Sequence, residues 1–135
     1  MYFLSIVTPD KIIFEGQVNS LIAPGTIGYL EILKDHAPII TSLRAGKLII
    51  TNEQNEKSLY AISGGFLEVY RNNATVLGDT IEAASDIDIK RAEAAAERAR
   101  KMVEFPTSET DAIRAKNSLK RSENRIKIYH DFTKI

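Results

Sequence analysis

Glycine divides this chain into two unlike parts. All seven glycines of the 135 residues lie at or before Gly78, and none follows. Glycine supplies the backbone conformations that tight turns need, and it weakens the interior of a helix. The sequence therefore predicts a turn-rich first domain at residues 1–84 and a helical second domain at residues 85–135.

Short apolar runs fill the first part, and turn residues separate them. We expect Glu15-Gly16 to split two runs as a bulge or turn, and Asn72-Asn73 to form a hairpin turn, because Asn tolerates positive φ. Many short strands with frequent turns favour a β-sandwich or barrel. The expected strands are residues 2–8, 11–14, 17–23, 29–33, 39–43, 46–51, 59–62, 65–70 and 74–77.

From Ser85 onward the apolar residues follow a helical period. Ser85 and Asp88 form an S-x-x-D capping box that predicts the start of a first helix, and Ser108 and Asp111 repeat it after Pro106. Two helices joined by about five residues predict an antiparallel hairpin. The expected facing stripes are Ala92, Ala95, Ala96, Ala99, Met102 and Val103 on the first helix, and Ala112, Ala115, Leu119, Ser122, Ile126 and Tyr129 on the second.

Small residues on both stripes predict a close but weak contact between the helices. Burying a methyl group stabilises by about 0.8 kcal/mol, against roughly 1.5–3 kcal/mol for a leucine-sized side chain. Such a hairpin can form and can also come apart. A hairpin docked permanently on the sheet is the other interpretation that composition leaves open.

Composition and missing motifs exclude several classes of protein. The chain has no cysteine, which excludes disulfides and thiolate metal sites. It shows no His/Asp/Glu cluster at metal-ligand spacing, no G-x-S-x-G and no phosphate-binding loop, so we expect no metal, no required cofactor and no catalytic residue. Gly64-Gly65 is assigned instead to close strand packing. We find neither a signal peptide nor an apolar run of about 20 residues, and we expect membrane association only through a partner.

Charge is distributed unevenly between the two parts. Residues 1–84 hold 6 Lys+Arg and 9 Asp+Glu, whereas the remaining residues hold 12 and 9. Few aromatic residues accompany the basic ones, and an acidic first domain would repel phosphate, so nucleic acid is not an expected partner.

Three stretches carry a resemblance to a known family. They are DHAPIIT at 35–41, AISGGFLEV at 61–69 followed by NNATVLGDTIEAASDID at 72–88, and the helical hairpin after them. In this order and spacing the chain resembles the bacterial epsilon subunit of the rotary F-type ATP synthase. The resemblance implies an α+β fold, with an N-terminal β-sandwich of about ten strands and a C-terminal two-helix hairpin.

The resemblance also implies a function. The protein would be a non-catalytic central-stalk rotor subunit at the cytoplasmic face of the bacterial plasma membrane, with the sandwich bound to the gamma subunit and the c-subunit ring. A mobile hairpin would inhibit ATP hydrolysis by reaching the alpha and beta subunits in an extended state. An autonomous small-molecule-binding sandwich with a helical lid is the alternative. The basic residues available to acidic partners are Arg98, Arg100, Lys101, Arg114, Lys116, Lys120 and Arg121.

Ile87-Asp88-Ile89-Lys90-Arg91-Ala92 matches a motif through which some bacterial members of this family bind ATP as a regulatory ligand. A triphosphate needs converging cations, preferably guanidinium groups. Spacings of seven and four residues place two arginines on one face of each helix. The ordinary interpretation is that Asp88 caps the helix and pairs with Arg91. The expected ATP-binding residues are Glu82, Asp88, Arg91, Arg98, Arg121 and Arg125.

His36 is the expected contact with the c-ring, because the resemblance implies that the H-A-P loop faces the ring. This chain departs from the family pattern beside it. Tyr29 stands where similar proteins carry an acid, and Lys34-Asp35 stand where they carry Pro-Gly. We therefore expect a loop of different shape and charge, and a c-ring contact at Tyr29 stays open.

Overall fold

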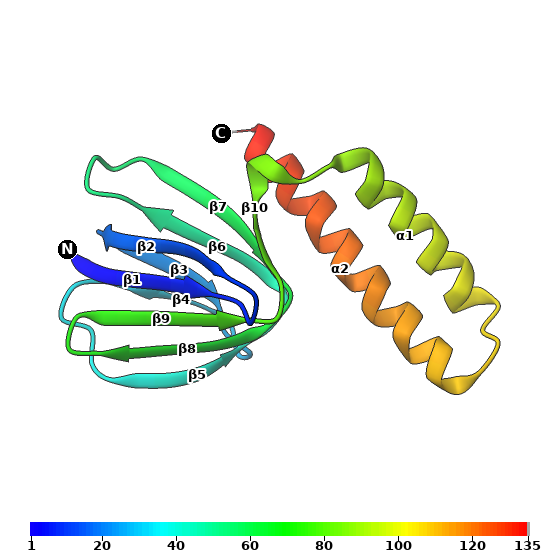
Figure 1. Ribbon diagram of the computed structural model, residues 1–135, viewed down its shortest axis with the longest axis horizontal. Helices are drawn as coiled ribbons and strands as arrows, with labels where there is room; N and C mark the ends of the chain where they lie inside the picture. The colour runs from blue at the N-terminus through cyan, green and yellow to red at the C-terminus, as the bar shows by residue number, and fades with distance from the viewer. Residues whose placement is uncertain (135) are drawn as a thin grey trace. The chain divides into compact units, whose positions relative to one another are not determined.

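The computed structural model describes residues 1–134 (Figure 1). It divides the chain into two compact units, Met1–Ala83 and Ala84–Ile135, although Ile135, the last residue of the predicted hairpin, lies outside the described residues. The first unit contains two five-stranded sheets, and the second contains a 3-10 turn and two α-helices. The predicted α+β fold, a β-sandwich followed by a helical hairpin, is confirmed.

The strands of the sandwich form two sheets. The first sheet has the order β2-β1-β9-β8-β5, and the second has the order β10-β7-β6-β3-β4. Within the first sheet β1 and β9 pair in parallel, whereas β8 and β9 form an antiparallel hairpin. The strands are β1 (Tyr2–Val7), β2 (Ile12–Val18), β3 (Ser20–Pro24), β4 (Tyr29–Ile32), β5 (Ile39–Leu43), β6 (Gly46–Thr51), β7 (Lys57–Ile62), β8 (Gly65–Tyr70), β9 (Asn73–Gly78) and β10 (Ile81–Ala83).

Large aliphatic side chains from both sheets form the sandwich core. Each stabilises the fold by roughly 1.5–3 kcal/mol on burial. Tyr2 is buried with them, and its hydroxyl donates a hydrogen bond of 2.7 Å to the carbonyl oxygen of Ile32. Burial raises the pKa of the Tyr2 hydroxyl well above its ordinary value. The fully buried core residues include Leu4, Ile6, Leu21, Ile32, Leu48, Ile62, Leu67 and Val76.

The predicted break at Glu15-Gly16 is wrong. β2 runs through both residues, because Glu15 pairs with Ser5 and Gly16 pairs with Leu4 in the β1–β2 ladder. The chain instead leaves the strand at Asn19, whose side-chain amide donates to the carbonyl oxygen of Asn52 at 3.0 Å. Long-range strand pairing thus overrides the local turn preference of glycine.

The β8–β9 turn lies one residue earlier than predicted. Arg71 and Asn72 both have positive φ, at 49° and 59°, and Asn73 already belongs to β9. The residue pattern also missed β10, which is only three residues long and pairs with β7. A strand this short carries no alternation that a pattern can detect.

The second unit begins with a 3-10 turn, η1 (Ala84–Asp86), before α1 (Ile89–Glu104) and α2 (Glu109–Thr133), which lie side by side and antiparallel (Figure 1). The predicted capping box at Ser85 is wrong. Asp88 is itself the N-cap of α1, and its Oδ1 accepts the backbone N–H of Arg91 at 3.1 Å. The turn of η1 delays the helix and leaves Ser85 outside it.

The predicted start of α2 is confirmed. Ser108 is the N-cap, and its hydroxyl oxygen accepts the backbone N–H of Asp111 at 3.1 Å. The Thr107 hydroxyl donates to the Asp111 carboxylate. This hydrogen bond, with that of Ser108, holds the pKa of Asp111 below its ordinary value.

Small residues dominate the contact between the helices, as predicted. The buried residues of α1 are Ala92, Ala96 and Ala99, and those of α2 include Ala115 and Ser122. Two details differ. Met102, expected on the facing stripe, is 41% exposed. Ile128, outside the predicted stripe, is buried.

Replacing Gly65 with alanine is expected to destabilise the sandwich by about 3 kcal/mol, because an added Cβ would lie 1.9 Å from the backbone oxygen of Leu77. This is the close strand packing predicted for the glycine pair. Gly28→Ala is the control, since no atom lies within 4 Å of an added Cβ there, and it should change stability by less than about 0.5 kcal/mol. Urea unfolding measures both variants, and equal midpoints would disprove the close approach.

Candidate functional site

Arginines gather on one flank of the hairpin. Arg91 and Arg98 each precede a buried alanine of α1 by one residue, and Arg121 precedes buried Ser122 of α2. One residue is a rotation of about 100° round a helix. Because the helices are antiparallel, this rotation leads to the same flank from both. Arg125, three residues after Ser122, is rotated about 60° to that side too. We call Arg91, Arg98, Arg121 and Arg125 the arginine flank.

Two of these arginines also lie at the same level along the hairpin. Arg91 is thirteen residues before Glu104, the end of α1, and Arg121 is twelve residues after Glu109, the start of α2. Arg98 lies about 10 Å nearer the connecting loop, at about 1.5 Å per residue. The flank therefore presents guanidinium groups from both helices to one elongated region.

Three members of the arginine flank, Arg91, Arg98 and Arg121, have no ionic partner among the described residues, whereas Arg125 takes part in an interaction of its own. Within residues 1–134 the guanidinium groups of Arg91 and Arg98 form neither a hydrogen bond nor a salt bridge. Arg121 donates to the neutral hydroxyl of Ser118 at 3.1 Å. Arg100, on the opposite flank, is instead paired with Glu97 at 2.8 Å. Uncompensated guanidinium groups that converge are what a polyanion requires.

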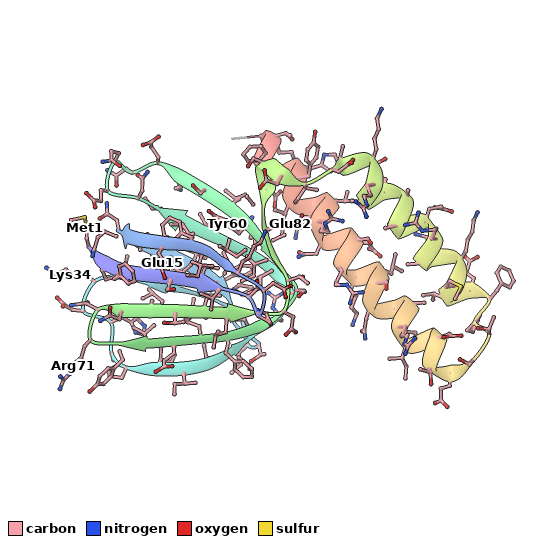
Figure 2. The ribbon with its side chains drawn as sticks, in the orientation of Figure 1. Met1, Glu15, Lys34, Tyr60, Arg71 and Glu82 are labelled. Carbon is pink, nitrogen blue, oxygen red and sulfur yellow. The ribbon has the colours of Figure 1, made fainter. Side chains whose placement is uncertain are left out.

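The two carboxylates of the predicted ATP site, Asp88 and Glu82, belong to different units. Asp88 caps α1 and does not form the predicted side-chain pair with Arg91. Glu82 lies in β10 of the first unit, where it is half-buried and pairs with Ala61 (Figure 2). The four arginines and Asp88 thus belong to the hairpin, whereas Glu82 belongs to the other unit.

His36 lies in the loop between β4 and β5, half-buried, with Nδ1 2.6 Å from the carbonyl oxygen of Ala37. The preceding Asp35 has a φ of 63°. Its backbone N–H donates to Asn72 Oδ1 at 2.7 Å, and Asn72 Nδ2 donates back at 2.9 Å. These two bonds hold the left-handed turn in place without a glycine. Lys34 and Arg71 occupy the same end of the sandwich as Met1 (Figure 2).

Tyr29 lies at the other end of β4, after the turn Gly25-Thr26-Ile27-Gly28. Ile27 at this turn is 102% exposed. Sequence reasoning missed Ile27, although an aliphatic residue inside a glycine-flanked turn is an unusual pattern. Tyr29 thus begins β4, whereas His36 lies in the loop beyond the other end of that strand.

The outer face of the first sheet is apolar and acidic. Phe66 pairs with Leu77, Leu77 with Val7, and Val7 with Ile12, which makes one cross-strand row. Phe66, Leu77 and Ile12 are each more than half exposed. Glu68 and Glu15 belong to the adjacent row, and Ile40 opposite Glu68 is 76% exposed. Sequence reasoning missed this face because it did not assign the residues of each short strand to an inner or an outer face.

At its β5 edge the same face is hollowed by a depression of about 330 Å³. Its lining residues are Pro38, Ile39, Ile40, Glu68, Val69 and Tyr70.

Residues 1–134 contain neither of two further features. No group of three or more His, Cys, Asp or Glu side chains there could hold a metal ion. No helix in that part of the chain combines the length and the apolar composition that a bilayer crossing requires.

Comparison with known proteins gives a consistent result over both units. The family model described as ATP synthase, Delta/Epsilon chain, beta-sandwich domain matches residues 1–84, and its long alpha-helix domain matches residues 85–129. The chain is 43% identical over 125 residues to the ATP synthase epsilon chain of Desulforamulus reducens, covering 92% of this chain and 93% of that protein. It is 40% identical over 126 residues to that of Syntrophomonas wolfei, covering 93% and 92%.

Two solved structures have the same fold. A chain of the Euglena gracilis mitochondrial ATP synthase, in a structure of OSCP, F1 and c-ring, superposes with a TM-score of 0.80 at 24% identity, covering 90% of this chain and 76% of that one. A chain of the Tetrahymena thermophila mitochondrial ATP synthase central stalk and c-ring has a TM-score of 0.56 at 18% identity, covering 97% and 95%. At these identities the likeness shows the fold alone.

Substitutions at Asp88 test whether this residue is the N-cap of α1. Asp88→Ala is expected to destabilise the helical unit by about 1 kcal/mol, whereas Asp88→Asn should cost a few tenths, because Asn also caps helices. Ser85→Ala serves as the control and should have no effect, since Ser85 is not the cap. Thermal unfolding followed by helical circular dichroism gives the comparison. A loss of stability in Ser85→Ala as large as that in Asp88→Ala would refute the assignment of Asp88 as the cap.

Proposed function

The chain belongs to the ATP synthase delta/epsilon chain family, and we propose from this that it is the epsilon subunit of an F-type ATP synthase, coupling gamma to the c-ring without catalysing a reaction itself. The observation that carries the proposal is a sequence identity of 43% and 40% to two epsilon chains, over more than nine tenths of both sequences in each case. The subunit would be peripheral, held at the cytoplasmic face of a bacterial membrane by its complex. A match over more than nine tenths of both sequences disfavours the alternative of an autonomous small-molecule binder with a helical lid.

The outer face of the first sheet is the proposed surface for gamma. An exposed apolar row such as Phe66, Leu77 and Ile12 marks an interaction surface, because a monomer rarely exposes contiguous apolar area. Glu15 and Glu68 beside it would repel a second copy of the same face. A partner with basic residues around an apolar patch would complement it.

The c-ring is proposed to meet one end of the sandwich. The expected residue His36 is half-buried, with a ring nitrogen engaged by its own loop. Ile27 at the opposite end is fully exposed. Exposed apolar area favours the Ile27 end as the contact, and the His36 end is the alternative that the same experiment tests.

The hairpin is the proposed regulatory element. Because small residues form most of its helix contact, opening exposes little apolar area and costs correspondingly little free energy. The opened helices would present basic residues, among them Arg98, Arg114 and Arg121, to acidic surfaces of the alpha and beta subunits. This extended state would inhibit ATP hydrolysis.

ATP is the proposed ligand of the arginine flank. Arg91 and Arg121 lie level on the two helices, so one triphosphate could bridge them and favour the closed hairpin. The ligand can shift the balance only through its different affinity for the closed and open states. Arginines that bind ATP in the closed state would be unavailable to the alpha and beta subunits, so the two uses compete.

Single cysteines test the surfaces assigned to gamma and the c-ring, since the chain has no cysteine of its own. In the assembled complex, a bifunctional crosslinker on Phe66→Cys is expected to capture gamma, and one on Ile27→Cys a c-subunit. His36→Cys is the matched position at the other end. Capture of a c-subunit from His36 and not from Ile27 would reverse the orientation proposed here, and capture of neither gamma nor a c-subunit at any position would contradict the rotor assignment.

Calorimetric titration of the full chain with Mg-free ATP tests the arginine flank. Arg91→Ala should weaken binding about tenfold or more, because a charge-assisted hydrogen bond contributes roughly 1.5–3 kcal/mol. Arg100→Ala is the matched control, since it removes a cation of the same helix from the opposite flank. Equal affinities in the two variants would show that the flank is not the ATP site.

A further inference from the structure

The turn that carries Ile27 is fixed from several sides. The backbone N–H of Gly28 donates to the carbonyl oxygen of Gly25 at 3.2 Å, and the backbone N–H of Arg44 donates to that of Pro24 at 2.9 Å. Gly25 also forms a β-bridge with Leu43. A single exposed aliphatic residue is ordinary on a mobile loop. Here it stands on a turn whose backbone is hydrogen-bonded within itself and to the neighbouring segment.

Arg44 ties this turn to Tyr29. Its Nε–H donates to the carbonyl oxygen of Gly25 at 3.2 Å. Its guanidinium carbon lies 5.2 Å from the centre of the Tyr29 ring, within the range of a cation–π contact. One side chain therefore contacts the first residue of the turn and the residue that follows the turn.

Tyr29 is in turn held at its far end. Its hydroxyl oxygen accepts the backbone N–H of Lys47 at 3.1 Å. Gly46 makes room for it, because a Cβ at Gly46 would lie 2.7 Å from that hydroxyl oxygen. The ring is thus fixed at its face by Arg44 and at its tip by Lys47.

We propose that Arg44 and Tyr29 are positioning residues, which clamp the 25–28 turn so that Ile27 is presented to the c-ring as a preformed apolar contact. The inference rests on the proposed contact of this end with the c-ring. A turn that is already ordered pays less entropy on association, so a small apolar contact on it contributes more to binding. Ile27 itself is 102% exposed, so its side chain contributes no buried surface to the sandwich core.

The clamp is tested first on the full chain without a partner. Amide hydrogen exchange at Gly28 reports whether the turn opens. Arg44→Ala is expected to speed this exchange by ~2–5-fold, the factor that corresponds to the loss of an exposed cation–π contact. Arg71→Ala is the matched control, because Arg71 stacks on Tyr70 at the same 5.2 Å at a different turn. Tyr29→Phe keeps the ring contact with Arg44 and loses only the hydrogen bond from Lys47. Its exchange rate at Gly28 should therefore lie between those of the unaltered chain and Arg44→Ala. Unchanged exchange in Arg44→Ala overturns the clamp, whatever the partner.

A double-mutant cycle then tests whether the clamp acts through Ile27. Binding of the full chain to purified c-ring should fall by ~10-fold or more in Ile27→Ala, as for an interface anchor, and by ~2–5-fold in Arg44→Ala. In the Ile27→Ala background, Arg44→Ala should have no further effect, because a positioning residue has nothing left to position. Additive losses would overturn the positioning role and leave the contact in place.

If Ile27→Ala binds the c-ring as the unaltered chain does, while exchange at Gly28 still responds to Arg44→Ala, the proposed c-ring contact at this end is wrong and the clamp does not serve it. Arg44→Lys guards against a simple folding defect. This variant keeps the cation but loses the hydrogen bond from Nε–H. Its unfolding midpoint should equal that of the unaltered chain, and it should bind the c-ring more tightly than Arg44→Ala does.

Discussion

The contact between α1 and α2 is made by side chains too small to make it strong, and the proposed switch depends on this. Ala92, Ala96 and Ala99 face Ala115 and Ser122, and each methyl group contributes about 0.8 kcal/mol on burial. The sandwich instead contains large, fully buried side chains such as Leu4, Leu67 and Val76. Burial of each of them stabilises the fold by roughly 1.5–3 kcal/mol. One unit is therefore suited to remain folded while the contact within the other is broken and remade.

Each helix carries its own N-cap, so opening the hairpin does not require melting it. Asp88 caps α1, and Ser108 caps α2 beside the Thr107–Asp111 hydrogen bond. These interactions are local in sequence and independent of the contact between the helices. The arginine flank is different, because it exists only while Arg91 and Arg121 lie level on the closed hairpin. A polyanion that binds the flank therefore reports, and favours, the closed state.

The sequence predicted what depends on local periodicity and missed what depends on distant contacts. The change from turn-rich strands to alanine-rich helices is visible in the residues themselves, and the spacing of the arginines already placed two on one face of each helix. The continuation of β2 through Gly16 depends on pairing with β1, and the start of α1 is delayed by the turn of η1. Whether Ser85 or Asp88 caps α1 depended on that same turn. Ile27 and Phe66 were missed because an apolar residue in a strand or turn looks the same in sequence whether it faces the core or solvent.

The most direct test of the weak contact is to lock it. Ala99 lies five residues before the end of α1 and Ala115 six residues after the start of α2, so these two buried positions are the pair chosen for a disulfide across the closed hairpin. ATP hydrolysis is then measured in the assembled complex with the Ala99→Cys, Ala115→Cys chain, oxidised and reduced. A regulatory hairpin predicts faster hydrolysis when the disulfide is formed and renewed inhibition after reduction. Equal rates in both states, with the disulfide verified, would contradict a switch that works by opening these helices.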